Sequence, residues 1–169
     1  MEILIDQQKL ATRIRELGQQ ISEDYRGKSL ICIGVLKGCV LFMSDLIRQI
    51  DGDVSIDFMG VSSYRGKEST GVVQITLDLR GNIEGKDVLI VEDIVDSGLT
   101  LQYLMQALQV RNPESLRIVT LLNKSECRKV EVPLDYVGFE IPNAFVVGYG
   151  LDLDERFRNL SHIAIYDGE

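Results

Sequence analysis

The stretch that most constrains the fold of this chain runs from Val88 to Thr100, VLIVEDIVDSGLT. It begins as a continuous apolar run, continues into the carboxylates Glu92, Asp93 and Asp96, and ends in a small Ser-Gly-x-Thr turn. A continuous apolar run of this kind predicts a strand buried on both faces. The turn then opens an amphipathic helix, so the polar groups are expected where a buried strand ends and a helix begins.

Apolar runs and amphipathic segments alternate along most of the chain. Continuous apolar runs at 29–36 and 116–122 predict further buried strands, and 54–61 predicts another strand between them. Alternation of apolar and polar residues over 73–79 predicts a half-exposed antiparallel strand. Helical spacing of apolar residues occurs over 10–21, 43–50 and 101–108, with Asp6 as a cap for the first helix. This order predicts an α/β domain with a largely parallel central sheet flanked by helices.

Composition limits the classes of partner. The 169 residues suit a single domain, 1–169, and a net charge of -8 is the opposite of a general nucleic-acid or anionic-membrane binder. Cys32, Cys39 and Cys127 form no CxxC pair, which favours reduced thiols over a disulfide or zinc site. No apolar run approaches the roughly 20 residues of a membrane span, and the start at Met1 is too acidic for a signal peptide. A cytoplasmic protein is therefore expected.

The central stretch suits a ligand that carries hydroxyls and a phosphate. Adjacent carboxylates such as Glu92 and Asp93 can reach neighbouring ribose hydroxyls, or help to hold Mg²⁺, which needs few protein ligands. Backbone N–H groups of residues 96–100, at a helix start, favour a phosphate. For any one residue alone, a solvated acid or a helix cap at Ser97 or Thr100 is the better interpretation. Their combination in one run favours the ligand site.

Neither GxxxxGK[ST] nor GxGxxG occurs, so another phosphate-sugar motif is needed. VLIVEDIVDSGLT resembles the phosphoribosyl pyrophosphate-binding motif of type I phosphoribosyltransferases, and VGFEIPNAFVVGYGLD (137–152) resembles the purine-binding hood of hypoxanthine-guanine phosphoribosyltransferases. Further family segments match, in the same order, at 36–38, 62–64 and 154–158. The resemblance covers about residue 30 to the C-terminus. It implies the type I phosphoribosyltransferase fold, with a small hood built from the N-terminal segment and the C-terminal part, about 133–169.

The resemblance assigns the sugar phosphate to the central stretch. Glu92 and Asp93 would contact the ribose hydroxyls and the associated Mg²⁺, and Asp96 would be the general acid/base at N7 of the purine. The loop for the 5′-phosphate would consist of Asp96, Ser97, Gly98, Leu99 and Thr100. Position 99 is leucine rather than the basic residue of some relatives, so contact there is expected from the backbone only.

Five residues are implied to bind pyrophosphate or to close over it: Lys37, Gly38, Ser63, Tyr64 and Arg158. The Lys37–Gly38 loop binds through backbone groups in relatives that have a cis peptide bond before the lysine. Ser63 and Tyr64 match the loop that excludes water, and the planar fork of Arg158 suits phosphate oxygens. Judged without the resemblance, an exposed loop lysine and a surface arginine remain competing interpretations.

The resemblance assigns the purine to Lys124, Phe145, Val146 and Asp152. Lys124 would donate to O6, which favours a 6-oxopurine over a 6-aminopurine because ammonium has donors and no acceptor. Phe145 would stack on the base, although in isolation it is better read as a core residue. Val146 would meet the purine edge through its backbone, and Asp152 would lie near the 2-substituent and a second Mg²⁺.

The implied activity is purine salvage, with transfer of the 5-phosphoribosyl group from 5-phospho-α-D-ribose 1-diphosphate to hypoxanthine or guanine. The products are IMP or GMP and pyrophosphate, the cofactor is Mg²⁺, and the assembly is a homodimer or homotetramer without nucleic-acid or membrane partners. Two alternatives stay open. One is a transferase that prefers xanthine and guanine, and the other is a non-catalytic regulator that senses the sugar diphosphate and binds RNA or DNA. The pI near 4.7 and the complete hood argue against the regulator.

Overall fold

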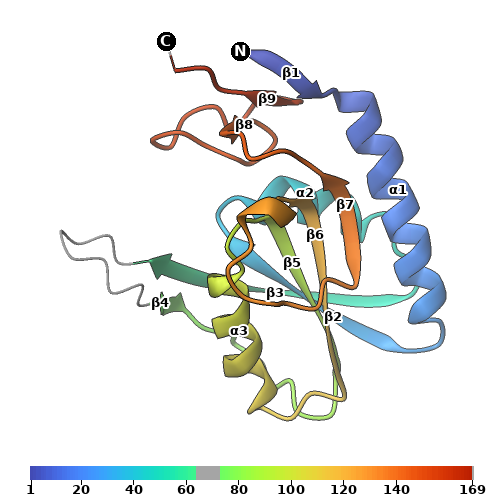
Figure 1. Cartoon of the computed structure of the whole chain (residues 1–169). Helices are drawn as coiled ribbons and strands as arrows, with labels where there is room; N and C mark the ends of the chain where they lie inside the picture. Colours follow the sequence, from blue (N-terminus) through green and yellow to red (C-terminus); the bar gives the residue numbers. More distant parts are fainter. Residues whose placement is uncertain (64–72, 169) are drawn as a thin grey trace.

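Two β-sheets organise the chain in a computed structural model, which describes residues 1–63 and 73–168 (Figure 1). The larger, six-stranded sheet consists of β2 (Ser29–Leu36), β3 (Asp53–Ser63), β4 (Val73–Leu77), β5 (Asp87–Val95), β6 (Ser115–Asn123) and β7 (Tyr136–Glu140), in the order β4-β3-β2-β5-β6-β7. The three-stranded sheet consists of β1 (Glu2–Ile5), β9 (Ile163–Ile165) and β8 (Val146–Val147).

The larger sheet is parallel except at one edge. β2 pairs in parallel with β3 and β5, β5 with β6, and β6 with β7, whereas β4 is antiparallel to β3. The predicted α/β domain with a largely parallel sheet is therefore confirmed, and so is the antiparallel strand expected over 73–79. The central pair β2–β5 places the most apolar strands in the middle of the sheet, where both faces are covered.

The three α-helices of the described residues cover the two faces of this sheet. α1 (Gln7–Asp24) and α2 (Cys39–Ile47) lie on one face, and α3 (Leu99–Gln109) lies on the other (Figure 1). α1 begins where predicted, because Asp6 Oδ1 accepts the backbone N–H of Lys9 at 2.8 Å. Its buried residues are Leu10, Ile14, Leu17, Gly18 and Ile21, which follow the helical spacing of the sequence.

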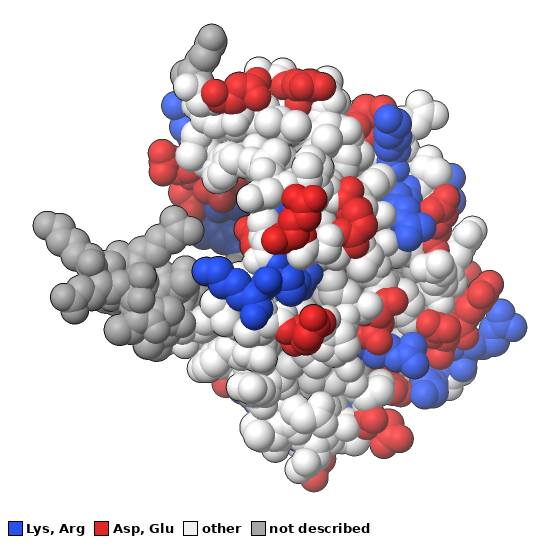
Figure 2. Space-filling view, in the orientation of Figure 1, with Lys and Arg blue, Asp and Glu red and all other residues white. Residues whose placement is uncertain are grey.

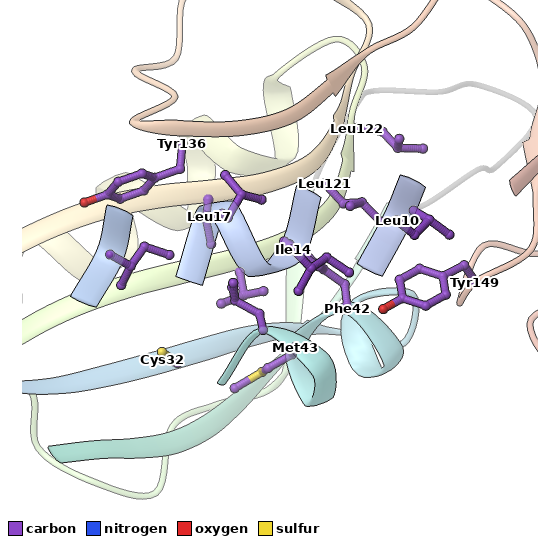
Figure 3. Close-up of a cluster of buried hydrophobic side chains, with 14 of the residues drawn as sticks. Leu10, Ile14, Leu17, Cys32, Phe42, Met43, Leu121, Leu122, Tyr136 and Tyr149 are labelled. Atoms are coloured by element: carbon purple, nitrogen blue, oxygen red, sulfur yellow. The ribbon is translucent and has the colours of Figure 1, made fainter. Parts of the chain in front are cut away.

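Strand β5 explains why the organising stretch is apolar without interruption. Leu89 and Val91 point into the cluster under α1 and α2, whereas Val88 and Ile90 point into the cluster under α3. All four side chains have 0% exposure. Figure 3 shows the first cluster, in which α1 residues face Phe42 and Met43 of α2 and residues from β6, with Tyr136 and Tyr149 at its two ends.

The smaller sheet joins the two ends of the chain. β9 pairs antiparallel with β1 and with β8, and both termini lie beside it (Figure 1). Strand β1 was not predicted, because four residues are too few to show a period. The expected hood included about residues 133–169, but β7, which lies in this range, belongs to the larger sheet. The bounds of the hood therefore stay a prediction. In the part of the chain that the structure describes, no helix combines the length and hydropathy needed to cross a membrane.

Candidate active site

Three polar segments that are far apart in the sequence meet at one edge of the larger sheet. Lys37–Gly38 follows β2, Glu92–Thr100 ends β5 and starts α3, and Lys124 follows β6. Because β2, β5 and β6 are parallel neighbours, their carboxyl ends lie side by side. The three segments therefore share one edge of the sheet, the edge at which ligands of such sheets bind.

The turn between β5 and α3 forms the floor of a pocket. Residues 92–101, together with Val73, line a pocket of about 350 Å³. Gly98, at φ 84, is the N-cap residue of α3 and provides no side-chain cap, while Ser97 Oγ accepts the Leu99 N–H at 3.3 Å. Because residues 98–101 line this pocket, the N-terminus of α3 lies at it with the positive end of the helix dipole, which suits an anion.

Glu92 and Asp93 form an acidic pair in which Glu92 is buried and Asp93 is half-buried. Burial raises the pKa of Glu92 well above its usual range, and repulsion from Asp93 adds to the shift. Burial likewise raises the pKa of Asp93, although the backbone N–H of Ile94 donates to its Oδ1 at 2.8 Å. Glu92 Oε2 is buried and has no hydrogen-bond partner among the described residues. The Glu92 carboxylate oxygen Oε2 is therefore a buried acceptor that no donor of the described residues compensates.

Gly38 lies directly against this pair. A Cβ atom at Gly38 would be 1.6 Å from Asp93 Oδ2, and a Cβ atom at Gly150 would be 2.1 Å from the Gly38 carbonyl oxygen. Only glycine fits at either position, so the loop after β2 is held between the acidic pair and the segment after β8. The Leu36–Lys37 peptide bond is cis, and the Lys37 side chain is exposed.

Lys124 and Asp96 form a donor and an acceptor next to one another. Lys124 Nζ lies 3.2 Å from Asp96 Oδ1, with side-chain exposures of 9% and 55%. The backbone N–H of Lys124 donates to the Val95 carbonyl at 3.0 Å, which fixes the start of the segment after β6 against the end of β5. A planar ligand with an acceptor beside a donor on one edge could bind both groups.

The residues predicted to bind the purine from the hood lie around β8. Val146 is buried in the small sheet, and Phe145 is 51% exposed with its ring edge-on to Tyr166 at 6.3 Å. Asp152 does not join the acidic pair. Its Oδ1 lies 3.0 Å from Arg158 Nη2, and its Oδ2 accepts the Glu155 N–H at 2.8 Å.

Arg158 is oriented by the backbone as well as by Asp152. Its Nη1 donates to the Gly150 carbonyl at 2.7 Å, while its buried Nε has no hydrogen-bond partner within the described ranges. The Arg158 charge opposes the rise in the pKa of Asp93, so the two groups are electrostatic neighbours. Arg158 therefore lies at the same edge as Gly38 and the acidic pair.

Two residues expected in the site are only partly described. Ser63 is the last residue of β3 and pairs with Val73, but its side chain is outside the described set. Tyr64 lies outside the described residues. Within the described parts of the chain, no group of three or more His, Cys, Asp or Glu side chains is arranged to hold a metal ion. Glu92 and Asp93 remain as a two-carboxylate candidate.

Two residues near the site were missed by the sequence reasoning. The Tyr149 hydroxyl donates to Asp45 Oδ2 and ties the segment between β8 and Arg158 to α2. Glu155 pairs with both Lys37 and Arg158. Tyr149 lies between two glycines in the sequence, a pattern that indicates a turn, and its φ of 50° agrees with a turn at this position. No sequence signal distinguishes Glu155 from its acidic neighbours.

Comparison with known protein families gives a match to the phosphoribosyl transferase domain over residues 1–154. The matched range includes β5 with its acidic pair, the turn that follows β5, and the loop after β2. The chain belongs to the phosphoribosyltransferase family.

Individual relatives show which members of that family the chain resembles in sequence and structure. A hypoxanthine-guanine phosphoribosyltransferase of Dictyostelium discoideum is 51% identical over 96% of this chain and 93% of its own length. One from Staphylococcus aureus is 53% identical over 96% of this chain and 91% of its own length. A crystal structure of the Bacillus anthracis hypoxanthine-guanine phosphoribosyltransferase superposes with a TM-score of 0.94 at 46% identity, covering 98% of each chain. The chain thus groups with the hypoxanthine-guanine phosphoribosyltransferases and has the type I phosphoribosyltransferase fold.

Proposed function

We propose that this chain transfers the 5-phosphoribosyl group from 5-phospho-α-D-ribose 1-diphosphate to hypoxanthine or guanine, giving IMP or GMP and pyrophosphate. The main support for a 6-oxopurine as the base is the 3.2 Å distance between Lys124 Nζ and Asp96 Oδ1. A 6-oxopurine has the acceptor O6 beside N7 on one edge, whereas adenine has a donor amino group in place of O6. An ammonium next to a carboxylate matches O6 beside a protonated N7.

The proposed reaction forms a bond between N9 of the base and C1′ of the sugar, while the bond from C1′ to pyrophosphate breaks. The transition state resembles an oxocarbenium ion. Asp96 accepts the N7 proton as N9 becomes alkylated, and its side-chain exposure of 55% leaves it accessible to the base. No covalent nucleophile is required, so positioning and electrostatics supply the rate.

The remaining binding roles follow the positions of the side chains. The turn Asp96–Thr100 receives the 5′-phosphate, and Leu99 contributes only its backbone. Pyrophosphate binds to the backbone of Lys37–Gly38 and to Arg158, whose guanidinium matches phosphate oxygens. Phe145, half exposed beside Val146, stacks on the base. Ser63 and Tyr64 belong to the segment proposed to exclude water during transfer.

Mg²⁺ fits the acidic pair. Glu92 is buried beside the half-buried Asp93, the two carboxylates repel each other, and Glu92 Oε2 has no partner among the described residues. A hard cation or ribose hydroxyls would relieve this situation. Asp152 is a candidate for a second ion. When bound, Mg²⁺ neutralises charge on the pyrophosphate leaving group. The chain itself holds the carboxylates next to Gly38, where the sugar diphosphate would lie.

Assembly and location are proposed by family analogy. A homodimer or homotetramer in the cytoplasm agrees with the family membership and with the reduced cysteines expected from the sequence. Cys32 and Cys39 are buried free thiols.

A xanthine-guanine preference would use the same edge and differs only at the 2-substituent, near Asp152. A nucleic-acid-binding regulator is less well supported. Figure 2 shows Asp and Glu mixed with Lys and Arg over the visible face instead of a broad basic surface, and the net charge is -8.

The test is turnover of a panel of free bases with the sugar diphosphate and Mg²⁺, followed by ultraviolet absorbance. Hypoxanthine and guanine should be consumed, adenine should not, and xanthine decides between the two transferases. Salt-dependent binding of RNA or DNA without consumption of any base would replace the enzyme with the regulator.

A further inference from the structure

One exposed carboxylate bridges two cations at the candidate pyrophosphate site. Glu155 Oε2 lies 3.1 Å from Lys37 Nζ, and Glu155 Oε1 lies 3.2 Å from Arg158 Nη2. Lys37 follows β2, whereas Glu155 and Arg158 come from the segment after β8, so this carboxylate joins the two sides of the site. The proposed function uses the Lys37 loop and Arg158, but it gives Glu155 no role.

We propose that Glu155 occupies an anion position of pyrophosphate in the free protein, and that the diphosphate of the substrate must displace it. The inference rests on the proposed function for the identity of the anion. The Arg158 guanidinium that is proposed to bind pyrophosphate also donates to the Glu155 carboxylate, which Lys37 Nζ holds from the other side, so Arg158 cannot serve both anions fully. Glu155 therefore weakens pyrophosphate binding and favours release of this product after transfer.

The local backbone holds Glu155 in this position. Asp154 and Glu155 have φ values of 51° and 64°, and Leu153 and Arg156 exchange backbone hydrogen bonds across the tight turn that they form. The Glu155 N–H donates to Asp152 Oδ2 at 2.8 Å. Hydrogen bonds from Lys37 and Arg158 lower the pKa of Glu155, which keeps it ionised near neutral pH.

Displacement of Glu155 need not disturb Arg158. Asp152 Oδ1 remains 3.0 Å from Arg158 Nη2, and the Gly150 carbonyl accepts from Nη1 at 2.7 Å. Glu155 itself is 63% exposed, so its ion pairs are screened by solvent and each changes affinities by only a few-fold. These contacts describe a weak, exchangeable anion beside a fixed arginine.

The matched control is Asp154, an exposed neighbour that forms none of the ion pairs found among the described residues. Calorimetric titration of the full-length protein with pyrophosphate and Mg²⁺ would compare the wild type, Glu155→Gln and Asp154→Asn. Glu155→Gln should lower the Kd of pyrophosphate by about three- to tenfold at low salt, with a smaller change at high salt. Asp154→Asn should change the Kd by less than about twofold.

Equal or weaker binding by Glu155→Gln would overturn the inference, and so would equal tightening by Asp154→Asn, because that would be a general effect of charge. Absence of pyrophosphate binding to the wild type also overturns it. Purine turnover is scored separately. If the wild type consumes no base but Glu155→Gln binds pyrophosphate more tightly than the wild type does, the proposed function is removed and the role of Glu155 is kept. If the wild type turns over purine normally but Glu155→Gln leaves the Kd of pyrophosphate unchanged, the proposed function is kept and the role of Glu155 is removed.

Discussion

The substitution Glu92→Gln should stabilise the free protein while it removes activity. Glu92 is 9% exposed, its Oε2 has no partner among the described residues, and Asp93 repels it. An unsatisfied buried polar atom costs about 1–3 kcal/mol, and a charge costs more. Glutamine keeps the volume without the charge, so the free energy of unfolding should rise by about 1–3 kcal/mol at pH 8. In a chain of this size, this corresponds to roughly 2–12 °C in Tm.

The pH dependence gives this prediction its sign. The pKa of Glu92 is raised in the folded state, so folding carries no penalty below the unfolded pKa, where both states are protonated. The penalty appears as the pH rises through the window between the unfolded and folded pKa values, and it is complete above that window. The difference between Glu92→Gln and the wild type should therefore be present at pH 8 and absent near pH 4.

Urea unfolding followed by circular dichroism at both pH values provides the measurement, without substrates or Mg²⁺. Glu131→Gln, at an exposed glutamate, is the control and should stay within about 0.5 kcal/mol of the wild type. A less stable Glu92→Gln at pH 8, or an equal difference at both pH values, would refute the reasoning. The same variant should lose turnover, because the charge that costs stability is proposed to bind the ribose hydroxyls and Mg²⁺.

Three further substitutions test neighbouring parts of the site. Gly38→Ala should lower turnover by about 100-fold or more, because its Cβ would overlap Asp93 Oδ2, and circular dichroism should still report a folded protein. Phe145→Ala should raise the KM for hypoxanthine at least about fivefold with little change in the KM for the sugar diphosphate, and equal changes in both would argue against stacking. Tyr149→Phe should lower the free energy of unfolding by about 0.5–1.5 kcal/mol in urea titrations, through loss of the bond to Asp45, and an unchanged value would mean that this bond does not matter.

The strands and helices of the larger sheet were predictable because their signals are local. The apolar run before Glu92 contains both faces of β5, and the spacing from Leu10 to Ile21 contains the buried face of α1. The order of these elements fixes which carboxyl ends meet, so the shared edge of Lys37, Glu92 and Lys124 could also be expected.

Contacts between distant segments could not be predicted in the same way. β1 pairs with β9 across nearly the whole chain, and β1 has only 4 residues, too few for a period to appear. The sequence contains Gly38, but only the folded chain reveals that Asp93 and Gly150 both press against it. The exposed Glu155 resembles its neighbours until the two cations around it are placed.

The central claim is that Asp96 handles the N7 proton between a 6-oxopurine and the sugar. The most direct measurement compares wild type and Asp96→Asn for kcat with hypoxanthine and for the Kd of the sugar diphosphate. Loss of a general base should lower kcat by about 10²- to 10⁴-fold, and the Kd should change little because the backbone of the turn still binds the 5′-phosphate. An unchanged kcat would contradict the role of Asp96, and a large rise in the Kd with normal kcat would reduce it to a binding residue.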